Sequence, residues 1–189
     1  MPTDEELAIA AKALNDDAFA ELVRRYLRRV HGFSYRYLLD RAEAEEATQE
    51  TFVKAWRALH RFDQKRSFAT WLFAIARNTA LDRLKKKHPI PFAALQSADG
   101  EGDMAETLAD PEPLPPEALD AANLASRLEA ALAGLHPDDR AIIALHYDEH
   151  QTFEEIAETL GKPMNTVKSR HRRALGFLRD NLTLHQNGG

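Results

Sequence analysis

Apolar residues recur at the spacing of an α-helix on both sides of a proline-rich middle segment. Before that segment, apolar positions three and four residues apart over 19–30 predict a helix whose N-cap is Asp17 or Asp16. The same spacing predicts a second helix over about 41–60 and a third that begins at Ser67, a favourable N-cap residue. No segment shows the β-branched alternation of a strand, so the pattern predicts an all-α fold.

The same periodicity assigns an inward face to the second and third of these helices. The inward face of the second helix consists of Phe52, Ala55, Trp56 and Leu59, and that of the third of Phe68, Trp71, Leu72 and Ile75. Phe73 lies off this stripe, so it either covers another helix or is available to a binding partner. We interpret Trp71 mainly as a packing residue.

Beyond the middle segment, a helix is predicted with Pro137 in its first turn. Thr152 and Glu155 then form a capping box ahead of a short apolar stripe. Gly161 ends that helix by supplying the left-handed backbone conformation that a sharp turn needs, and Pro163 starts the next helix. Two short helices joined by a tight glycine turn form a helix-turn-helix.

The middle segment, residues 88–117, lacks helical periodicity and is rich in proline, glycine and acidic residues. This composition favours a flexible linker over a packed element. We therefore predict two small helical domains, residues 1–87 and 118–189, joined by a flexible acidic linker. The second domain contains the helix-turn-helix.

The net charge of −5 conceals an uneven distribution along the chain. Residues 1–87 carry a net charge of +4, residues 88–117 carry −7, and residues 118–189 carry −2. A polyanionic partner responds to such local charge rather than to the average. The overall acidity is therefore compatible with nucleic-acid binding by one segment.

The composition also excludes several classes of protein. There is no cysteine, which excludes disulfides, thiolate zinc sites and cysteine nucleophiles. The chain has no HExxH sequence, no paired metal-ligand spacing and no glycine-rich phosphate loop, so we expect no enzyme activity, metal or cofactor. The acidic N-terminus is unlike a signal peptide and no apolar run could cross a bilayer, so we expect a cytoplasmic protein without membrane insertion.

The last helix of the helix-turn-helix gathers basic residues on one face. Its inward positions on a helical wheel are Met164, Val167, His171, Ala174 and Leu178. The opposite face begins with Asn165, Lys168 and Arg172, which are residue types that read base edges in the DNA major groove. A solvated basic face is the alternative interpretation, but the capped first helix and the glycine turn favour DNA binding.

Three longer sequences resemble a known family. Residues 128–175, "LEAALAGLHPDDRAIIALHYDEHQTFEEIAETLGKPMNTVKSRHRRAL", closely resemble region 4 of bacterial sigma factors of the extracytoplasmic-function (ECF) class, and "TVKSR" is its most typical string. "AEEATQETFVKAW" (44–56) resembles region 2.2 of that class, and "FATWLFAIARNTALDRLKKK" (68–87) resembles regions 2.3 and 2.4. A LuxR-type output domain would share only the C-terminal half, so the N-terminal sequences favour the sigma-factor family.

The resemblance implies an alternative sigma factor that binds core RNA polymerase and recognises the −10 and −35 promoter elements. A stand-alone helix-turn-helix transcriptional regulator is the alternative. The residues implied for the −35 element are Asn165, Thr166, Lys168, Ser169, Arg170, Arg172 and Arg173. Those implied for the −10 element are Arg61, Lys65, Arg66, Ser67, Arg77, Asn78, Arg83, Lys85 and Lys86. Those implied for polymerase binding are Glu46, Gln49, Glu50, Val53 and Arg57.

These implied residues divide by role. We expect Lys168, Ser169 and Arg172 to reach bases, and Arg170 and Arg173 to contact phosphates. By the resemblance, the loop 61–67 holds a flipped −10 base, with Asn78 helping to read the element. Gln49 and Glu50 would contact the polymerase.

The implied partners are core RNA polymerase, through its β′ clamp helices and β flap, promoter DNA, and an anti-sigma factor. The acidic linker would thread through positively charged channels of the polymerase. Its alternative role is that of a flexible tether alone.

Two positions depart from the family pattern. His171 stands where leucine is usual, and we interpret it as a packed, hydrogen-bonded histidine. The alternative is that its protonation near the ordinary histidine pKa loosens region 4. Leu175 stands where relatives are often basic, which argues against phosphate contacts beyond Arg173.

Overall fold

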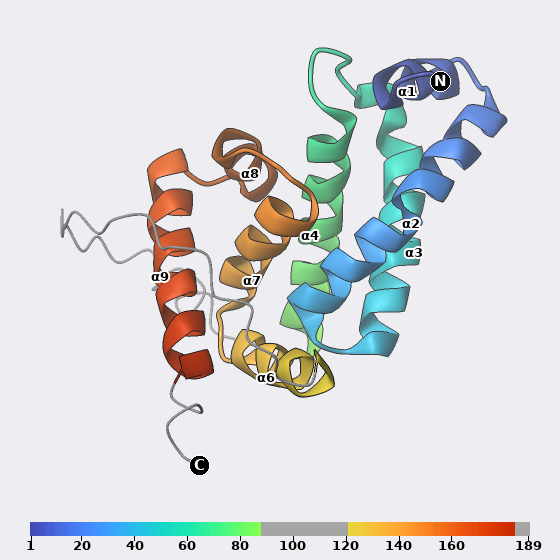
Figure 1. Cartoon of the computed structure of the whole chain (residues 1–189). Helices are drawn as coiled ribbons and strands as arrows, with labels where there is room; N and C mark the ends of the chain where they lie inside the picture. Colours follow the sequence, from blue (N-terminus) through green and yellow to red (C-terminus); the bar gives the residue numbers. More distant parts are fainter. Residues whose placement is uncertain (88–120, 184–189) are drawn as a thin grey trace.

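The computed structural model describes residues 1–87 and 121–183, which form helices, turns and loops without a strand (Figure 1). The N-terminal module, residues 1–87, contains α1 (Asp4–Lys12), α2 (Asp16–Leu38), α3 (Arg41–Ala58), the 3-10 helix η1 (Leu59–Arg61) and α4 (Phe68–Lys87). The all-α prediction is confirmed for the described residues. The linker predicted for 88–117 lies outside them, and the domain boundaries stay a prediction.

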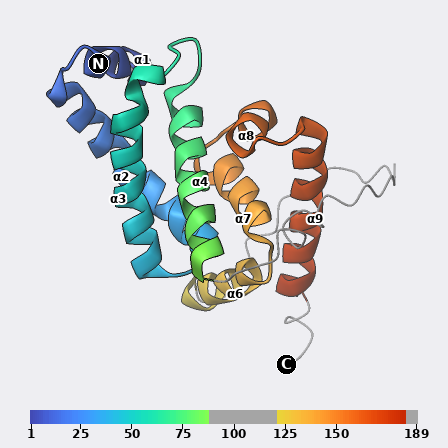
Figure 2. The same ribbon diagram turned by 180° about the vertical axis from the view of Figure 1, so that it is seen from behind.

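The C-terminal module, residues 121–183, packs against one side of the N-terminal module. It contains α6 (Ala121–Ala133), α7 (Pro137–Ile143), its π-helical continuation η3 (Ala144–Asp148), α8 (Phe153–Leu160) and α9 (Met164–Thr183). Figures 1 and 2 both show α4 between α3 and the C-terminal module, and α9 at the far edge of that module. The outer faces of α3 and α9 are thus at opposite sides of the molecule.

Aromatic rings from α2 and α4 form the core of the N-terminal module. Phe73 is fully buried and meets Tyr26 and Phe33 edge-on, with ring centroids 6.4 and 5.3 Å apart. Such edge-to-face contacts are favourable beyond the burial of area. The sequence left two roles open for Phe73, and the structure shows that it covers another helix, α2.

Two details of the N-terminal module differ from the sequence prediction. The N-cap of α2 is Asn15, whose side chain accepts from the amide of Ala18 at 3.1 Å, and not Asp16 or Asp17. These aspartates lie in the first turn, where negative charge complements the helix dipole. Trp56, predicted to point inward, is 39% exposed, and its ring packs on that of Phe19 at a centroid distance of 4.8 Å.

Helix α1 was not predicted from periodicity. A capping box starts it, in which the side chain of Thr3 accepts from the amide of Glu6 and the side chain of Glu6 accepts from that of Thr3. The helix buries Leu7 and Ala11 and lies across one end of α2 (Figure 1). The spacing of Thr3 and Glu6 was the signal that could have revealed it.

The predicted helix-turn-helix is present as α8 and α9. Thr152 and Glu155 make both hydrogen bonds of the capping box, at 2.8 and 3.3 Å. Gly161 ends α8 with φ 62° and ψ 35°, in the left-handed region. Pro137 lies in the first turn of α7. These local predictions are confirmed because each rests on backbone geometry that neighbouring residues decide.

We expect Gly161→Ala to lower the free energy of unfolding by about 1 kcal/mol, because a Cβ is strained at this positive φ. Gly32→Ala is the matched control, since Gly32 lies inside α2 and a Cβ there meets no atom within 4 Å. We expect that control to raise stability by about 0.5 kcal/mol, because alanine favours a helix. Urea unfolding followed by circular dichroism measures both, and equal shifts would contradict the assignment.

Candidate nucleic-acid and polymerase interfaces

The outer face of α9 presents hydrogen-bond donors to solvent. Its exposed side chains include Asn165, Lys168 and Arg172, while Val167 and Ala174 on the opposite face are buried. Ser169 and Arg173 are also exposed, and Thr166 is partly exposed. The donors lie in the half of α9 that follows the turn, which is the half that a recognition helix inserts into the major groove.

Arg170 does not belong to this face, contrary to the sequence prediction. It is 1% exposed, its Nε donates to Asp139 at 2.7 Å, and its guanidinium also donates to Nδ1 of His136 at 2.9 Å. Its position three residues after Val167 and four before Ala174 places it on the buried stripe. Arg170 therefore ties α9 to the start of α7 and cannot contact a phosphate in this arrangement.

The surface predicted for the −10 element consists of the loop before α4 and the later turns of α4. Arg61, Lys65 and Asn78 are exposed, as are Lys85 and Lys86. Ser67 is partly exposed, and its hydroxyl accepts from the amide of Thr70 at 3.4 Å. Arg61 and Lys65 precede the start of α4 and Lys85 and Lys86 lie in its last turn, so the exposed cations are spread over the length of the helix.

Arg83 was predicted to belong to this surface, but it faces α3. Its guanidinium donates to Glu43 and to Glu46 at 2.8 Å each and lies 3.4 Å from Glu50. The hydrogen bond to Glu43, followed by that to Glu46, raises the pKa of Arg83 above its ordinary value. Arg83 is therefore bound to carboxylates of its own module.

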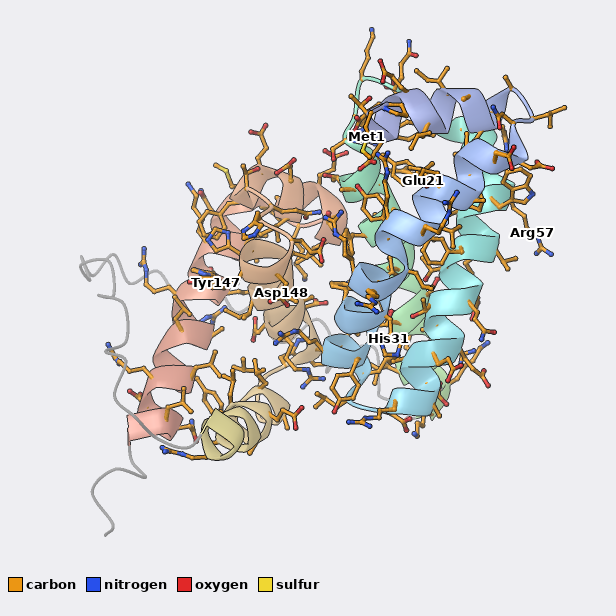
Figure 3. All side chains as sticks on the ribbon, turned by 45° about the vertical axis from the view of Figure 1, so that its right-hand side comes forward. Met1, Glu21, His31, Arg57, Tyr147 and Asp148 are labelled. Atoms are coloured by element: carbon orange, nitrogen blue, oxygen red, sulfur yellow. The ribbon has the colours of Figure 1, made fainter. Side chains whose placement is uncertain are left out.

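The polymerase-binding residues predicted on α3 share an outward face. Gln49 and Arg57 are exposed, Val53 is 49% exposed, and Glu46 is exposed although it also pairs with Arg83. Glu50 is partly buried and pairs with Lys54 at 2.9 Å. Figure 3 shows Arg57 on the edge of the N-terminal module that lies away from the C-terminal module. This face is open in the present arrangement.

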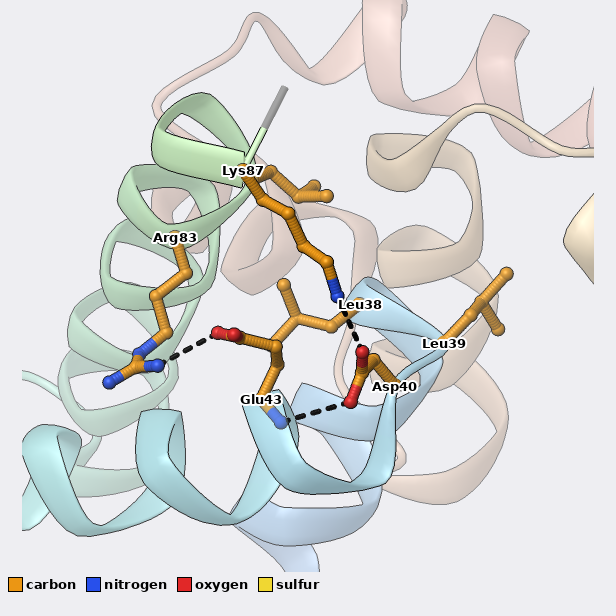
Figure 4. Close-up of a pocket in the computed structure, with 7 residues that line it drawn as sticks. Leu38, Leu39, Asp40, Glu43, Arg83 and Lys87 are labelled. Carbon is orange, nitrogen blue, oxygen red and sulfur yellow. Dashed lines mark hydrogen bonds and ion pairs between the residues drawn. The ribbon is translucent and has the colours of Figure 1, made fainter. Parts of the chain in front are cut away.

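A cavity of about 160 Å³ lies where the end of α2, the start of α3 and the end of α4 meet (Figure 4). Lys87 donates to Asp40 at 2.6 Å, and Asp40 also accepts from the amide of Glu43 as the N-cap of α3. Glu43 in turn pairs with Arg83. The charged groups of the cavity are thus paired with one another, which marks a junction of helices rather than a ligand site.

The two modules meet around a buried aspartate at the start of α7. Asp138 is 3% exposed and accepts from the hydroxyl of Tyr37 at 2.8 Å and from Arg77 at 3.2 Å. Lys162 lies 3.8 Å from it. Burial by itself would raise the pKa of Asp138, but Arg77, the Tyr37 hydrogen bond and Lys162 outweigh it and hold the pKa below its ordinary value.

Arg140 strengthens this contact from the same helix. Its guanidinium donates to the carbonyl oxygens of Arg36 and Tyr37, both at 2.8 Å, and to that of Leu135 at 2.6 Å. Arg36 and Tyr37 belong to the last turn of α2, where carbonyl groups lack helical partners and a cation is favoured. The C-terminal module therefore caps a helix of the N-terminal one.

Ion pairs surround this centre. Arg29 pairs with Glu149 at 2.6 Å, and Arg36 pairs with Asp148 at 2.8 Å, at the boundary visible in Figure 3. Arg66, in the loop before α4, pairs with Glu158 of α8 at 2.5 Å. Arg66 and Arg77, both predicted to contact DNA, are thus bound to the C-terminal module in this arrangement.

His171 lies in an aromatic cluster with His146, Tyr147 and Phe153, at centroid distances of 5.1 to 5.8 Å. It is packed as predicted, but its Nε2 is buried without a hydrogen-bond partner among the described residues. Burial, and then the charge of His146, lower the pKa of His171 below its ordinary value. The neutral form is therefore the one that fits the folded module.

Sequence reasoning missed the residues that join the modules, chiefly Asp138, Arg140 and Lys162. No local pattern distinguishes them, because an acid in the first turn of a helix is ordinarily solvated.

Among the described residues, no helix is long and apolar enough to span a membrane, and no His, Asp and Glu side chains gather in a group that could hold a metal.

Two family descriptions match the chain at the two modules. Residues 22–89 match Sigma-70 region 2, and residues 125–178 match Sigma-70 region 4. The chain therefore belongs to the sigma-70 family of transcription initiation factors. Within it, the chain is 34% identical to the ECF RNA polymerase sigma factor SigW of Bacillus subtilis over 169 residues, which cover 89% of this chain and 90% of SigW. It is an alternative sigma factor of the ECF class.

Solved structures agree with this assignment. CnrH in complex with the cytosolic domain of CnrY has a TM-score of 0.66 at 27% identity, covering 95% of this chain and 96% of CnrH. The sigma factor RpoE in complex with the anti-sigma factor NepR from Bartonella quintana has a TM-score of 0.64 at 26% identity, covering 87% of this chain and 96% of RpoE. The likeness extends over both modules.

We expect Asp138→Asn to lower the free energy of unfolding by about 2 kcal/mol at neutral pH, because the amide keeps the Tyr37 hydrogen bond but leaves Arg77 and Lys162 uncompensated. Small-angle scattering should show a larger radius of gyration as the modules separate. Glu158→Gln removes an exposed rim pair and is the control, with an expected loss below about 0.5 kcal/mol.

The pH dependence of the Asp138 effect follows from the lowered pKa. Wild type should exceed Asp138→Asn in stability by a constant margin above pH 3.8, the ordinary pKa of the carboxyl, and lose that margin as pH falls through the lower folded pKa. A margin that instead grows on acidification would contradict the ion pair.

We expect the stability of the wild-type chain to fall as pH drops below 6.5, because the unfolded chain takes up a proton that folded His171 resists. His171→Leu should be more stable by about 1 kcal/mol, since it removes an unsatisfied buried nitrogen. It should also lose less stability between about pH 7.5 and about pH 5.5. His136, whose pKa is lowered by burial and then by Arg170, remains in both proteins. Urea unfolding at the two pH values measures the difference, and parallel losses would exclude His171 as the cause.

Proposed function

We propose that this sigma factor reads the −35 element with the outer face of α9, engages the −10 element with α4 and the loop before it, and holds core RNA polymerase with the outer face of α3. The observation that carries the proposal is the exposed donor face of α9 directly after the glycine turn, on the side of the molecule opposite the exposed face of α3. Two outward surfaces of different chemistry suit a protein that joins DNA to a second macromolecule.

For the −35 element, we propose that Lys168, Ser169 and Arg172 reach bases and that Arg173 contacts phosphate. Asn165 and Thr166 lie in the first helical turn of α9. We propose that they contact either base edges or the phosphate backbone of the DNA. Arg170 leaves the proposed contact set because it is buried. Lysine and arginine read guanine edges, and serine is compatible with several bases.

For the −10 element, the proposed contacts are Arg61, Lys65, Ser67, Asn78, Lys85 and Lys86. Single-stranded bases are captured by stacking in a groove whose cations neutralise the phosphates. Arg66 and Arg77 join this set only when the modules part, because both pair with the C-terminal module here. Arg83 is left out of the proposed DNA contacts because its guanidinium pairs with Glu43 and Glu46 of α3.

The proposed partners are the β′ clamp helices and the β flap. The candidate contacts to the clamp helices are Glu46, Gln49, Glu50, Val53 and Arg57. CnrH and RpoE are each solved with a bound protein, CnrY or the anti-sigma factor NepR. We propose that an anti-sigma factor likewise holds this chain. The chain would act in the cytoplasm beside polymerase, which supplies the chemistry, so the chain itself needs no catalytic site or cofactor.

The direct test is transcription with core RNA polymerase on a library of promoter sequences. The proposal expects the chain to confer a start-site preference that depends on two elements, near −35 and −10. A stand-alone regulator would instead shift promoter duplex without polymerase and confer no start site. No association with core polymerase would overturn the polymerase-binding role of α3.

We expect Lys168→Ala and Arg172→Ala each to reduce −35-dependent transcription about tenfold, as a lost base contact costs about 1–3 kcal/mol. Arg179→Ala is the matched control, because Arg179 is an exposed arginine of the same helix beyond the proposed contacts and pairs with Asp180. Its effect should stay within about twofold. Run-off transcription on promoters with and without the selected −35 sequence measures all three, and an equal loss on both promoters would exclude sequence reading.

A further inference from the structure

The loop that precedes α4, residues 62–67, is held at both of its ends by α1. At the first end, Nζ of Lys12 donates to the carbonyl oxygen of Phe62 at 3.1 Å. At the second end, Oε1 of Glu5 accepts from the amide of Phe68, the first residue of α4, at 3.0 Å. Figures 1 and 2 both show α1 beside this loop.

Helix α1 is itself fixed to α2. Asp4 accepts from Arg25 at 2.7 Å and from the hydroxyl of Tyr26 at 2.5 Å, and Leu7 and Ala11 are buried. Tyr26 is 2% exposed and lies in the aromatic core. The position of α1 is therefore set by the rigid part of the module, and α1 can transmit that rigidity to the loop.

Apart from the ion pair of Arg66 with Glu158, the loop has few contacts outside α1. The side chains from Asp63 to Arg66 are exposed, and within the loop the amides of Lys65 and Arg66 donate to Asp63 at 3.0 Å. A shallow cavity of about 480 Å³ opens between the loop and α1, lined by Ile9, Lys12, Ala13, Phe62, Asp63 and Gln64. Space rather than packed side chains therefore adjoins the loop there, and the two hydrogen bonds from α1 define its ends.

The bond from Glu5 also has an electrostatic component. The first amides of a helix lack helical partners, and a carboxylate near them is favoured by the helix dipole. Glu5 thereby fixes the point at which the loop ends and α4 begins. Lys12 fixes the point at which the loop starts, next to Phe62, whose buried ring packs on Phe68 and Trp71 at 5.6 and 5.3 Å.

We propose that Glu5 and Lys12 are positioning residues for promoter opening: they hold the 62–67 loop in the conformation that captures a base of the −10 element. The inference rests on the proposed role of this loop. Ordering a free loop costs roughly 1–2 kcal/mol per residue, so a loop whose ends are fixed in advance binds single-stranded DNA more tightly and discriminates its sequence better.

The test uses holoenzyme assembled from core polymerase and the full chain, with a fork-junction DNA that exposes the −10 sequence selected by wild type. Glu5→Ala and Lys12→Met should each weaken fork-junction binding about tenfold, since each removes a charge-assisted hydrogen bond. The preference for the selected −10 sequence over a scrambled one should fall by a similar factor. Affinity for core polymerase and response to the −35 element should not change.

Conservative and control variants separate positioning from general stability. Glu5→Gln and Lys12→Arg keep an acceptor and a donor, and should recover binding to within about threefold of wild type. Glu6→Ala removes a carboxylate from the same turn and breaks the capping box of α1 without touching the loop, so it should stay within about twofold.

Each outcome decides between causes. If Glu5→Ala and Lys12→Met bind the fork like wild type, or if Glu6→Ala is as defective as they are, the positioning role is wrong. If wild-type holoenzyme itself shows no −10 preference, the proposed function of the loop fails first, and that result is distinct from the failure of α1 to position it.

Discussion

The two modules meet around one buried carboxylate, beside a hydrophobic core to which both contribute. Asp138 brings a negative charge into an interface where water is excluded, and such a charge is tolerated only when cations and donors surround it. Tyr37 and Arg77 of the N-terminal module and Lys162 of its own module do so. Arg140, two residues later, donates to the carbonyl oxygens of Arg36 and Tyr37 in the last turn of α2. Each module thus satisfies polar groups of the other, which makes their contact specific as well as stable.

Arginine serves four different purposes in this chain, and exposure distinguishes them. Arg170 is an interior ion-pair residue, Arg83 links α4 to carboxylates of α3, and Arg77 joins the modules. Arg172 is exposed on the outer face of α9. The guanidinium group therefore stabilises the interior of one module, the contact between two helices and the contact between the modules. Of these four arginines, Arg172 is the one whose side chain is exposed on an outer face. Counting basic residues overestimates the DNA-binding surface for this reason.

The arrangement of surfaces bears on how the protein can act. The outer faces of α3 and α9 are open, whereas two cations of the proposed −10 surface, Arg66 and Arg77, pair with the C-terminal module. The proposed binding of polymerase by α3 is compatible with this arrangement, whereas the proposed contacts of Arg66 and Arg77 with the −10 element require that the modules separate. The contact combines these ion pairs and hydrogen bonds with a hydrophobic core to which both modules contribute, for example Leu72 from α4 and Ile142 from α7. A partner that separates the modules would therefore have to replace apolar contacts as well as charges.

The sequence by itself determined the features that neighbouring residues control. The helical periodicity, the capping box at Thr152, the left-handed turn at Gly161 and the outward donors of α9 are local, and all were predictable, as was membership of the family from contiguous strings. Only the tertiary structure decided which charges are buried and with what they pair. Asp138 and Arg77 are distant in sequence, as are Lys12 and Phe62, and a residue's solvation depends on what the rest of the fold places against it. Burial of charge is a property of the whole packing, which a single sequence does not display.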